Sequence, residues 1–285
     1  MISSLAGDIL GSRFEFHTDE SKLSLFTGAC RFTDDTILLT ATMDAILNNK
    51  YTDGKAYSDA YLKYAQRYPK HGYGKRFAQQ VASGKLEPYN SYGNGSAMRV
   101  APIAWAFFDA KTILEQAKMS AEITHSHPEG IRGAQAVCYL IWLCKNGMPK
   151  PAMKKAMVEL FGDTYKKETK DFEKGKFDIT AQGTVPLCAS IFYETNGFEE
   201  AMWKAIDMGG DVDTNCCIIG AFCDAHYGLP NESITNEVYL RLSRDMAGTV
   251  TDFIHKYVDS SFIAPRIADV DNAILSLDIE DILHE

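Results

Sequence analysis

The sequence lacks three features that would define its class directly: patterned cysteines, a long apolar run and a surplus of basic residues. Its seven cysteines are odd in number, and none forms the C-x-x-C pair typical of zinc and redox sites. Small buried thiols in a reducing compartment therefore explain them better than a disulfide framework. No segment contains about 18 uninterrupted apolar residues, the length that a membrane helix needs, so we expect no membrane span.

Basic residues are scarce relative to acidic ones. The 285 residues include 29 Lys and Arg against 38 Asp and Glu, which gives a formal net charge of −9. Broad nucleic-acid binding is therefore not expected, because phosphate neutralisation needs clustered basic side chains. A local pocket for a phosphorylated ligand stays open. Residues 1–11 contain no basic segment before a long apolar stretch, so we expect a cytoplasmic protein without a signal peptide.

The alternation typical of strands is also scarce, and helical periodicity dominates. Apolar residues recur at helical spacing over 34–49, 57–68, 113–124, 133–143, 218–227 and 237–257. The segment 166–183 is dense in Lys, Glu and Asp and predicts an exposed connection. The chain contains no internal repeat. These patterns predict a single all-α, multi-helix domain over residues 1–285, and we expect the protein to be a monomer.

A first acidic cluster, Thr33-Asp34-Asp35-Thr36, directly precedes a predicted apolar helix. Threonine and aspartate are favoured at helix N-termini, where they accept backbone N–H bonds and complement the helix dipole. Helix capping could therefore explain this turn by itself. One cap needs only one side chain, however, whereas the turn offers two carboxylates and two hydroxyls. Taken alone, the turn is best interpreted as a cap, and the surplus of oxygen donors leaves an additional role open.

A second acidic cluster, Asp211-Val212-Asp213-Thr214, stands before another apolar helix. It begins like an EF-hand loop, but Cys216 replaces the turn glycine and Phe222 stands in place of the bidentate glutamate, so an EF-hand is excluded. If the two clusters meet near Glu15, either several of their carboxylates are protonated or cations neutralise them. Oxygen ligands suit hard ions such as Mg²⁺ or Mn²⁺, and two such ions could orient vicinal hydroxyls and activate a water molecule.

Two further segments contain polar groups suited to binding. The stretch from Ser91 to Arg99 has two glycines but not the third one of a dinucleotide fingerprint. By itself it predicts a turn, although the free backbone N–H groups of such a loop can also bind phosphate. Arg99 would assist there or pair with an acid of the site. His125 and His127 have no nearby cysteine or further histidine, so hydrogen bonding or ring stacking is favoured over metal ligation.

Taken in order, these elements resemble the ADP-ribosylglycohydrolase family, whose members release ADP-ribose from modified arginine or serine. The matching stretches are Gly7-Asp8-Ile9-Leu10-Gly11 with Glu15, Phe32 to Thr36, Gly93-Asn94-Gly95 through Met98-Arg99, Thr124 to Pro128, and Gly210 to Thr214. The resemblance extends from Gly7 to Gly228. The resemblance implies a compact all-α fold with a binuclear magnesium centre.

The resemblance also implies a role for each matching residue. The metal ligands would be Thr33, Asp34, Asp35, Asp211, Asp213 and Thr214. Glu15 would lie beside the metals, and Glu15 and Asp35 are the predicted catalytic residues. The substrate's diphosphate and distal ribose would be bound by Ser91, Tyr92, Gly93, Asn94 and Gly95, with His125 near the phosphates. One departure is that Cys216 and Cys217 stand where small alanines usually follow the second metal motif.

The predicted function is hydrolysis of the α-glycosidic bond between ADP-ribose and an acceptor, which would reverse ADP-ribosylation of a protein or a small molecule. Metal ions would orient the ribose hydroxyls, and Glu15 would act as general base or acid, or position the water. The alternatives are a non-catalytic ADP-ribose-binding or structural protein of this fold, and a hydrolase of another N-glycosidic or guanidine-like substrate. The acceptor, which could be arginine, serine or another group, stays open.

Overall fold

The computed structural model describes residues 1–15, 24–48 and 53–258, and the end of the predicted domain beyond 258 lies outside these ranges. Within them the chain is helical, and its one β-bridge joins Gly93 to Thr180. The helices are α1 (Ile2–Gly11), α2 (Asp34–Asn48), α3 (Gly54–Arg67), α4 (Lys75–Ser83), α5 (Gly95–Met98), α6 (Ala101–Ala106), α7 (Ala110–Glu122), α8 (Pro128–Lys145), α9 (Lys150–Phe161), α10 (Ala181–Glu194), α11 (Phe198–Met208), α12 (Val212–Tyr227), α13 (Glu232–Arg241) and α14 (Arg244–Phe253). The predicted all-α fold is confirmed.

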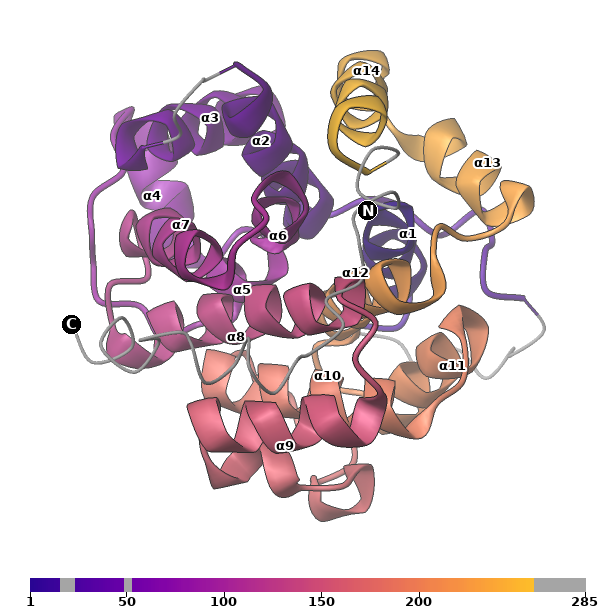
Figure 1. Ribbon diagram of the computed structural model, residues 1–285. Coiled ribbons are helices and arrows are strands. Elements are labelled where there is room, and N and C mark those ends of the chain that lie inside the picture. The colour runs from indigo at the N-terminus through magenta and orange to yellow at the C-terminus, as the bar shows by residue number, and fades with distance from the viewer. Residues whose placement is uncertain (16–23, 49–52, 259–285) are drawn as a thin grey trace.

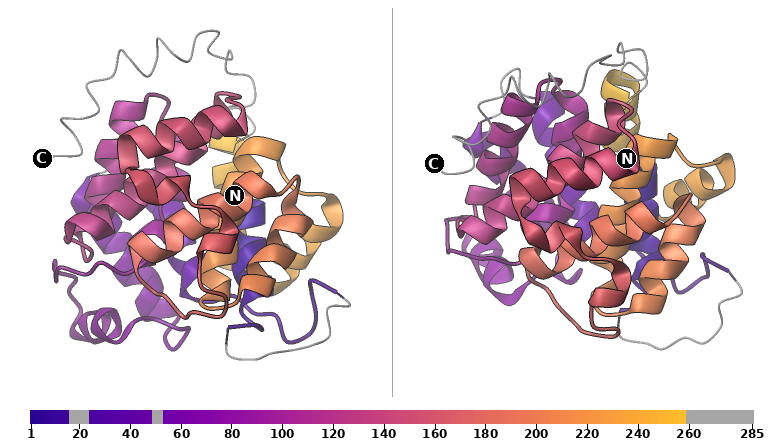
Figure 2. Two further views of the ribbon diagram at one scale, coloured as in Figure 1. Left: turned by 90° about the horizontal axis from the view of Figure 1, so that it is seen from below. Right: turned by 60° about the horizontal axis from the view of Figure 1, so that its bottom comes forward.

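Helices α1 and α12 lie side by side near the centre of the molecule (Figures 1 and 2). Helices α2 to α7 pack on one side of this pair, α9 to α11 lie on another, and α13 and α14 cover a third (Figure 1). Buried apolar side chains from Met1 to Val258 form one continuous cluster. None of the described helices has the length and apolar character needed to cross a membrane.

Glycines allow α1 and α12 to approach backbone to backbone. A methyl group added at Gly7 would lie 2.1 Å from the carbonyl oxygen of Cys216, and one added at Gly220 would lie 2.1 Å from that of Ser3. At the other end of α1, a methyl group on Gly11 would lie 2.7 Å from the Cα atom of Asp213. This packing places the first turn of α12 directly against α1. Cys216, whose carbonyl lies at this contact, is fully buried.

The predicted single helix over 237–257 is wrong. Helix α13 ends at Arg241 and α14 begins at Arg244, because Leu242 and Ser243 adopt extended backbone angles. The Tyr68 hydroxyl, at the end of α3, hydrogen-bonds to Ser243 Oγ and to an Asp245 carboxylate oxygen, each at 2.6 Å. A tertiary contact therefore fixes the break.

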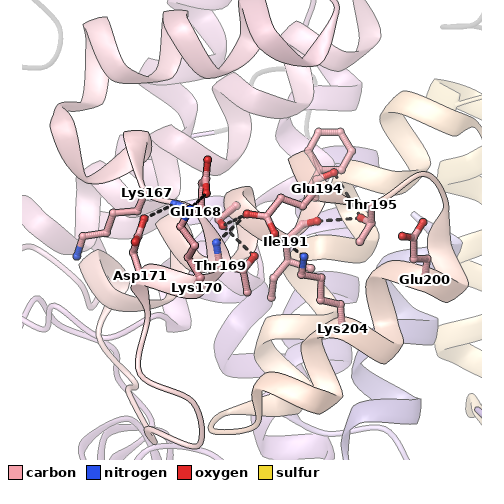
Figure 3. A network of polar contacts seen from close by, with 12 residues as sticks. Lys167, Glu168, Thr169, Lys170, Asp171, Ile191, Glu194, Thr195, Glu200 and Lys204 are labelled. Atoms are coloured by element: carbon pink, nitrogen blue, oxygen red, sulfur yellow. Dashed lines mark hydrogen bonds and ion pairs between the residues drawn. The ribbon is translucent and has the colours of Figure 1, made fainter.

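The prediction of an exposed connection over 166–183 is only partly correct. Its lysine side chains face solvent, but Thr169 is buried, and its N–H donates to Glu194 at 2.8 Å (Figure 3). The Thr169 hydroxyl lies 3.0 Å from that of Ser190. Two single turns, η1 (Asp163–Lys166) and η2 (Thr169–Asp171), order this part of the chain. Contacts with α10 thus anchor the segment.

The second half of this connection, residues 175–180, crosses from the end of α11 to the loop before α5, and we call it the strap. The Gly175 N–H donates to the Met208 carbonyl at 2.7 Å, and the Asn94 N–H donates to the Ile179 carbonyl at 2.8 Å. A methyl group on Gly210 would lie 2.3 Å from the Lys176 carbonyl oxygen. The strap therefore links two segments that contain predicted site residues.

Candidate active site

One cleft of about 480 Å³ is bordered by both acidic clusters. Asp34 and Asp35 reach it from the start of α2, and Asp211, Asp213 and Thr214 reach it from the start of α12. Asp35 and Thr214, 179 residues apart in sequence, are hydrogen-bonded, with the threonine hydroxyl donating at 3.3 Å. The rest of the wall comes from the segment 72–77, the loop before α5, His125 and the strap.

The carboxylates form two overlapping groups. One oxygen from each of Asp8, Asp35 and Asp213 lies within 4.8 Å of the others, and the same holds for Glu15, Asp211 and Asp213. Asp213 belongs to both groups. This arrangement is consistent with a metal site and matches the oxygen-only ligands that Mg²⁺ and Mn²⁺ prefer.

The hydrogen bonds of Asp8 indicate which groups cap the N-terminus of α2. Its carboxylate accepts the Thr33 N–H at 2.9 Å, the Thr33 hydroxyl at 2.5 Å and the Thr36 N–H at 3.1 Å. Much of the capping of α2 is therefore supplied from α1, with a weaker bond of 3.3 Å from the Asp35 N–H to Thr33 Oγ1. Asp34 and Asp35 are left to face the cleft.

Electrostatics show why this arrangement suits a cation. Burial raises the pKa of Asp34, Asp35 and Asp213 well above the usual aspartate range, and neighbouring carboxylates, Asp8 among them, raise each further. One oxygen of Asp35 is buried without a hydrogen-bond partner. Buried charges are stable only when paired or bound to a metal, so the donor set fits divalent ions.

Glu15 is half-buried and lies beside Asp211 and Asp213 at the cleft. Burial, together with the negative charge of Asp211, raises the pKa of Glu15 to about 7. A carboxyl group with a pKa near neutrality can both accept and release a proton at physiological pH.

The comparison with known proteins agrees with this geometry. A family model described as ADP-ribosylglycohydrolase matches residues 1–264. The chain belongs to the ADP-ribosylglycohydrolase family. Among its relatives, the ADP-ribosylhydrolase ARH3 of Danio rerio is 24% identical over 311 residues, covering 84% of each chain. The Homo sapiens ARH3 is 24% identical over 307 residues, covering 80% of this chain and 84% of the relative.

A solved structure titled "ADP-ribosylglycohydrolase-related protein complex" has the same fold. It superposes with a TM-score of 0.63 at 20% sequence identity, and the match covers 89% of this chain and 96% of the chain in that structure. The resemblance to the ADP-ribosylglycohydrolase family, inferred above from five short motifs, is thus confirmed.

In this member of the family, some of the predicted metal ligands are hydrogen-bonded to other protein groups. Asp211 accepts a hydrogen bond of 2.6 Å from the Asn94 amide, so Asn94, predicted to bind substrate, holds a predicted metal ligand. Asn94 also donates to Thr184 Oγ1 at 3.1 Å. Thr33 does not border the cleft, because its hydroxyl is turned toward Asp8 and Asp35.

The predicted phosphate loop is partly occupied by contacts within the protein. The Gly93 N–H donates to Ser91 Oγ at 3.2 Å, and the Asn94 N–H is bound by the strap. Ser91, Gly93 and Gly95 border the cleft. Tyr92 does not line it; its side chain is 50% exposed to solvent and packs edge-on against the His127 ring. A bound diphosphate would therefore need donors other than the Gly93 and Asn94 amides.

Several residues at or beside the cleft have no role in the sequence predictions. Asp8, behind the cleft, belongs to a matching motif, and its signal is that it is the only charged residue within the predominantly apolar segment 2–11. Phe177 and Ile179 of the strap, about half-exposed on the cleft wall, come from a segment whose composition predicts only solvent exposure. Tyr89 and Arg76, whose guanidinium lies 4.7 Å from the centre of the Tyr89 ring, also border the cleft.

Proposed function

We propose that this protein hydrolyses the glycosidic bond between ADP-ribose and an acceptor group. The observation that supports this most strongly is the convergence of both acidic clusters and Glu15 on one cleft in a chain of the ADP-ribosylglycohydrolase family. The relatives named ADP-ribosylhydrolase ARH3 align over most of this chain, which adds support.

The residues that would hold two divalent ions are Asp34, Asp35, Asp211 and Asp213, with Thr214 supplying a hydroxyl oxygen. Thr33, whose hydroxyl is turned toward Asp8, would support them from outside the cleft. When bound, such ions would neutralise these carboxylates, bind vicinal ribose hydroxyls and acidify a water molecule. Asp8 would keep the first turn of α2 in place through its bonds to Thr33 and Thr36. The side chain of Asn94 would do the same for Asp211.

Glu15 would transfer a proton from the attacking water to the departing acceptor. In the reaction, the oxygen of water forms a bond to the anomeric carbon, while the bond from that carbon to the acceptor nitrogen or oxygen breaks. The Glu15 carboxylate, with a pKa near 7, is suited to accept the proton of the attacking water and return it to the departing acceptor. Asp35, buried beside Asp8 and Asp213, would be one of the carboxylates that hold the ions.

A release assay over defined ADP-ribosyl linkages tests the proposal. Substrates attached through arginine, serine, an acyl ester and a nucleic-acid phosphate would be incubated with and without Mg²⁺, and free ADP-ribose measured. We expect Mg²⁺-dependent release from at least one of them, lost in Asp35→Asn and retained in Asp59→Asn, a control at an exposed residue of α3. Tight calorimetric binding of ADP-ribose without release would instead indicate a non-catalytic binder. No affinity for ADP-ribose would indicate a different substrate.

A further inference from the structure

The cleft wall contains three positive charges in addition to its carboxylates. Lys75 and Arg76, in the first turn of α4, border the same cleft as the two acidic clusters, and so does Arg99. Neither Lys75 nor Arg76 forms an ion pair with an acid among the residues that the structure describes. Positive charges that no protein group neutralises favour a ligand that is itself negatively charged.

Arg99 is already bound within the protein. Its guanidinium lies 4.2 Å from the centre of the Tyr61 ring, and the side chain is 1% exposed. One of its nitrogens donates to the Ser120 carbonyl at 2.9 Å and to Thr124 Oγ1 at 3.1 Å. Arg99 therefore contributes positive charge to the cleft rather than a free side chain.

Arg76 is held by an aromatic ring and keeps its donors free. Its guanidinium lies over the Tyr89 ring, 4.7 Å from the ring centre. The side chain is exposed and forms no hydrogen bond with a described residue. The five N–H donors of arginine lie in one plane. Stacking on a ring uses the face of that plane and leaves the donors at its edge, where two parallel bonds match the geometry of a phosphate.

Tyr89 determines where these donors lie. Its backbone N–H donates to the Thr124 carbonyl at 3.4 Å, which ties this part of the chain to the end of α7. Its half-buried ring lies beside that of His125, with the ring centres 6.2 Å apart. Ser91, two residues further on, borders the same cleft. Arg76 is thus placed on the cleft wall that leads to the loop beginning at Ser91.

We propose that Arg76, positioned by the ring of Tyr89, is a specificity-determining residue that binds the diphosphate of the substrate. The inference rests on the proposed function and adds to it the side chain that selects a negatively charged ligand. The Gly93 and Asn94 amides are already bonded within the protein, so a phosphate on this wall needs other donors. The diphosphate takes no part in the bond changes, so Arg76 should affect KM and leave kcat unchanged.

Calorimetry with ADP in EDTA tests this contact without the metal centre. ADP has the diphosphate but neither the terminal ribose nor an acceptor, so its affinity reports this part of the ligand alone. Arg76→Met keeps an apolar stem over the ring and removes the donors. We expect the variant to bind ADP about tenfold more weakly and adenosine equally well, because hydrogen bonds between charged groups are lost. Its ADP affinity should also fall less steeply with added NaCl than that of wild type.

Further variants separate a direct contact from a general effect of charge. Lys75→Gln removes the neighbouring charge on the same wall and should weaken ADP binding by no more than about twofold. Arg76→Lys keeps the charge but loses the planar fork, so it should regain the salt dependence and only part of the affinity. Tyr89→Leu should weaken ADP binding as Arg76→Met does, and Tyr89→Phe, which keeps the ring, should restore it. Unchanged ADP affinity in Arg76→Met, or an equal loss in Lys75→Gln, would overturn the proposal.

The outcome for the proposed function can be distinguished from this one. If wild-type protein with saturating Mg²⁺ released and bound no ADP-ribose, the proposed function would fail, and ADP binding in EDTA would still decide the Arg76 contact. If release occurred, Arg76→Met should raise KM about tenfold for every linkage that is cleaved. A KM raised only for a phosphate-linked acceptor, with ADP affinity unchanged, would assign Arg76 to the acceptor and contradict the inference.

Discussion

Replacing Asp35 by asparagine should change the stability of this protein in opposite directions with and without Mg²⁺. Without the ion, Asp35 lies within 4.8 Å of the carboxylate oxygens of Asp8 and Asp213, and one of its own oxygens has no partner. Two like charges at that separation repel by about 3 kcal/mol at an effective dielectric constant of about 20. Because proton uptake relieves part of this repulsion, we expect Asp35→Asn to stabilise the metal-free protein by about 1–3 kcal/mol.

With Mg²⁺ the order should reverse. A ligand at 100 times its dissociation constant stabilises the folded wild-type protein by about 2.7 kcal/mol. The Asp35→Asn variant, which lacks a central carboxylate, should gain less than about 1 kcal/mol. A domain of this size changes its melting temperature by about 2 °C for each kcal/mol.

Thermal unfolding of both proteins in EDTA and in Mg²⁺ measures these differences. Asp59→Asn, at a residue whose carboxylate is 63% exposed and paired with Lys55, is the control and should shift neither curve by more than about 1 °C. The reasoning would be refuted if Asp35→Asn were less stable than wild type in EDTA and gained as much as wild type from Mg²⁺.

Other changes test separate parts of the account. Gly220→Ala should destabilise the protein by about 2–4 kcal/mol in urea unfolding, because its methyl group would lie 2.1 Å from the Ser3 carbonyl oxygen of α1. Glu15→Gln should lower kcat in the release assay by about 10²–10⁴-fold while the stabilisation by Mg²⁺ largely persists. Phe177→Ala, on the cleft wall, should raise KM by about tenfold with kcat unchanged. In EDTA, the free energy of unfolding should fall as pH rises from about 4.5 to 7. The reason is that Glu15, with a pKa of about 7 in the folded protein, still holds a proton that the unfolded chain has released. Saturating Mg²⁺ should reduce this pH dependence, and melting experiments over this pH range measure both curves.

The helical fold could be predicted from the sequence because its signals are local. The helix expected over 34–49 is observed as Asp34–Asn48, and an apolar segment with few turn residues was enough to predict it. The break at Leu242 and Ser243 could not be predicted, since it depends on Tyr68 from a distant helix. Periodicity continues through 237–257 and contains no information about that contact.

The candidate site was predictable where residue type indicates chemistry. Clustered aspartates before two helices point to a metal centre, and the structure brings both clusters to one cleft. The direction of individual side chains was not predictable. Asn94, predicted to bind substrate, borders the cleft and its amide donates to Asp211, and Arg99 forms no ion pair with any described acid of the site. Such orientations are determined by packing between segments far apart in sequence.

A crystal structure of the protein grown with Mn²⁺, analysed by anomalous diffraction, tests the central claim most directly. The account predicts strong anomalous peaks in the cleft, each within about 2.0–2.3 Å of oxygens from Asp34, Asp35, Asp211 or Asp213. A saturated crystal with no manganese between the starts of α2 and α12, and with these carboxylates bonded only to protein or water, would contradict it.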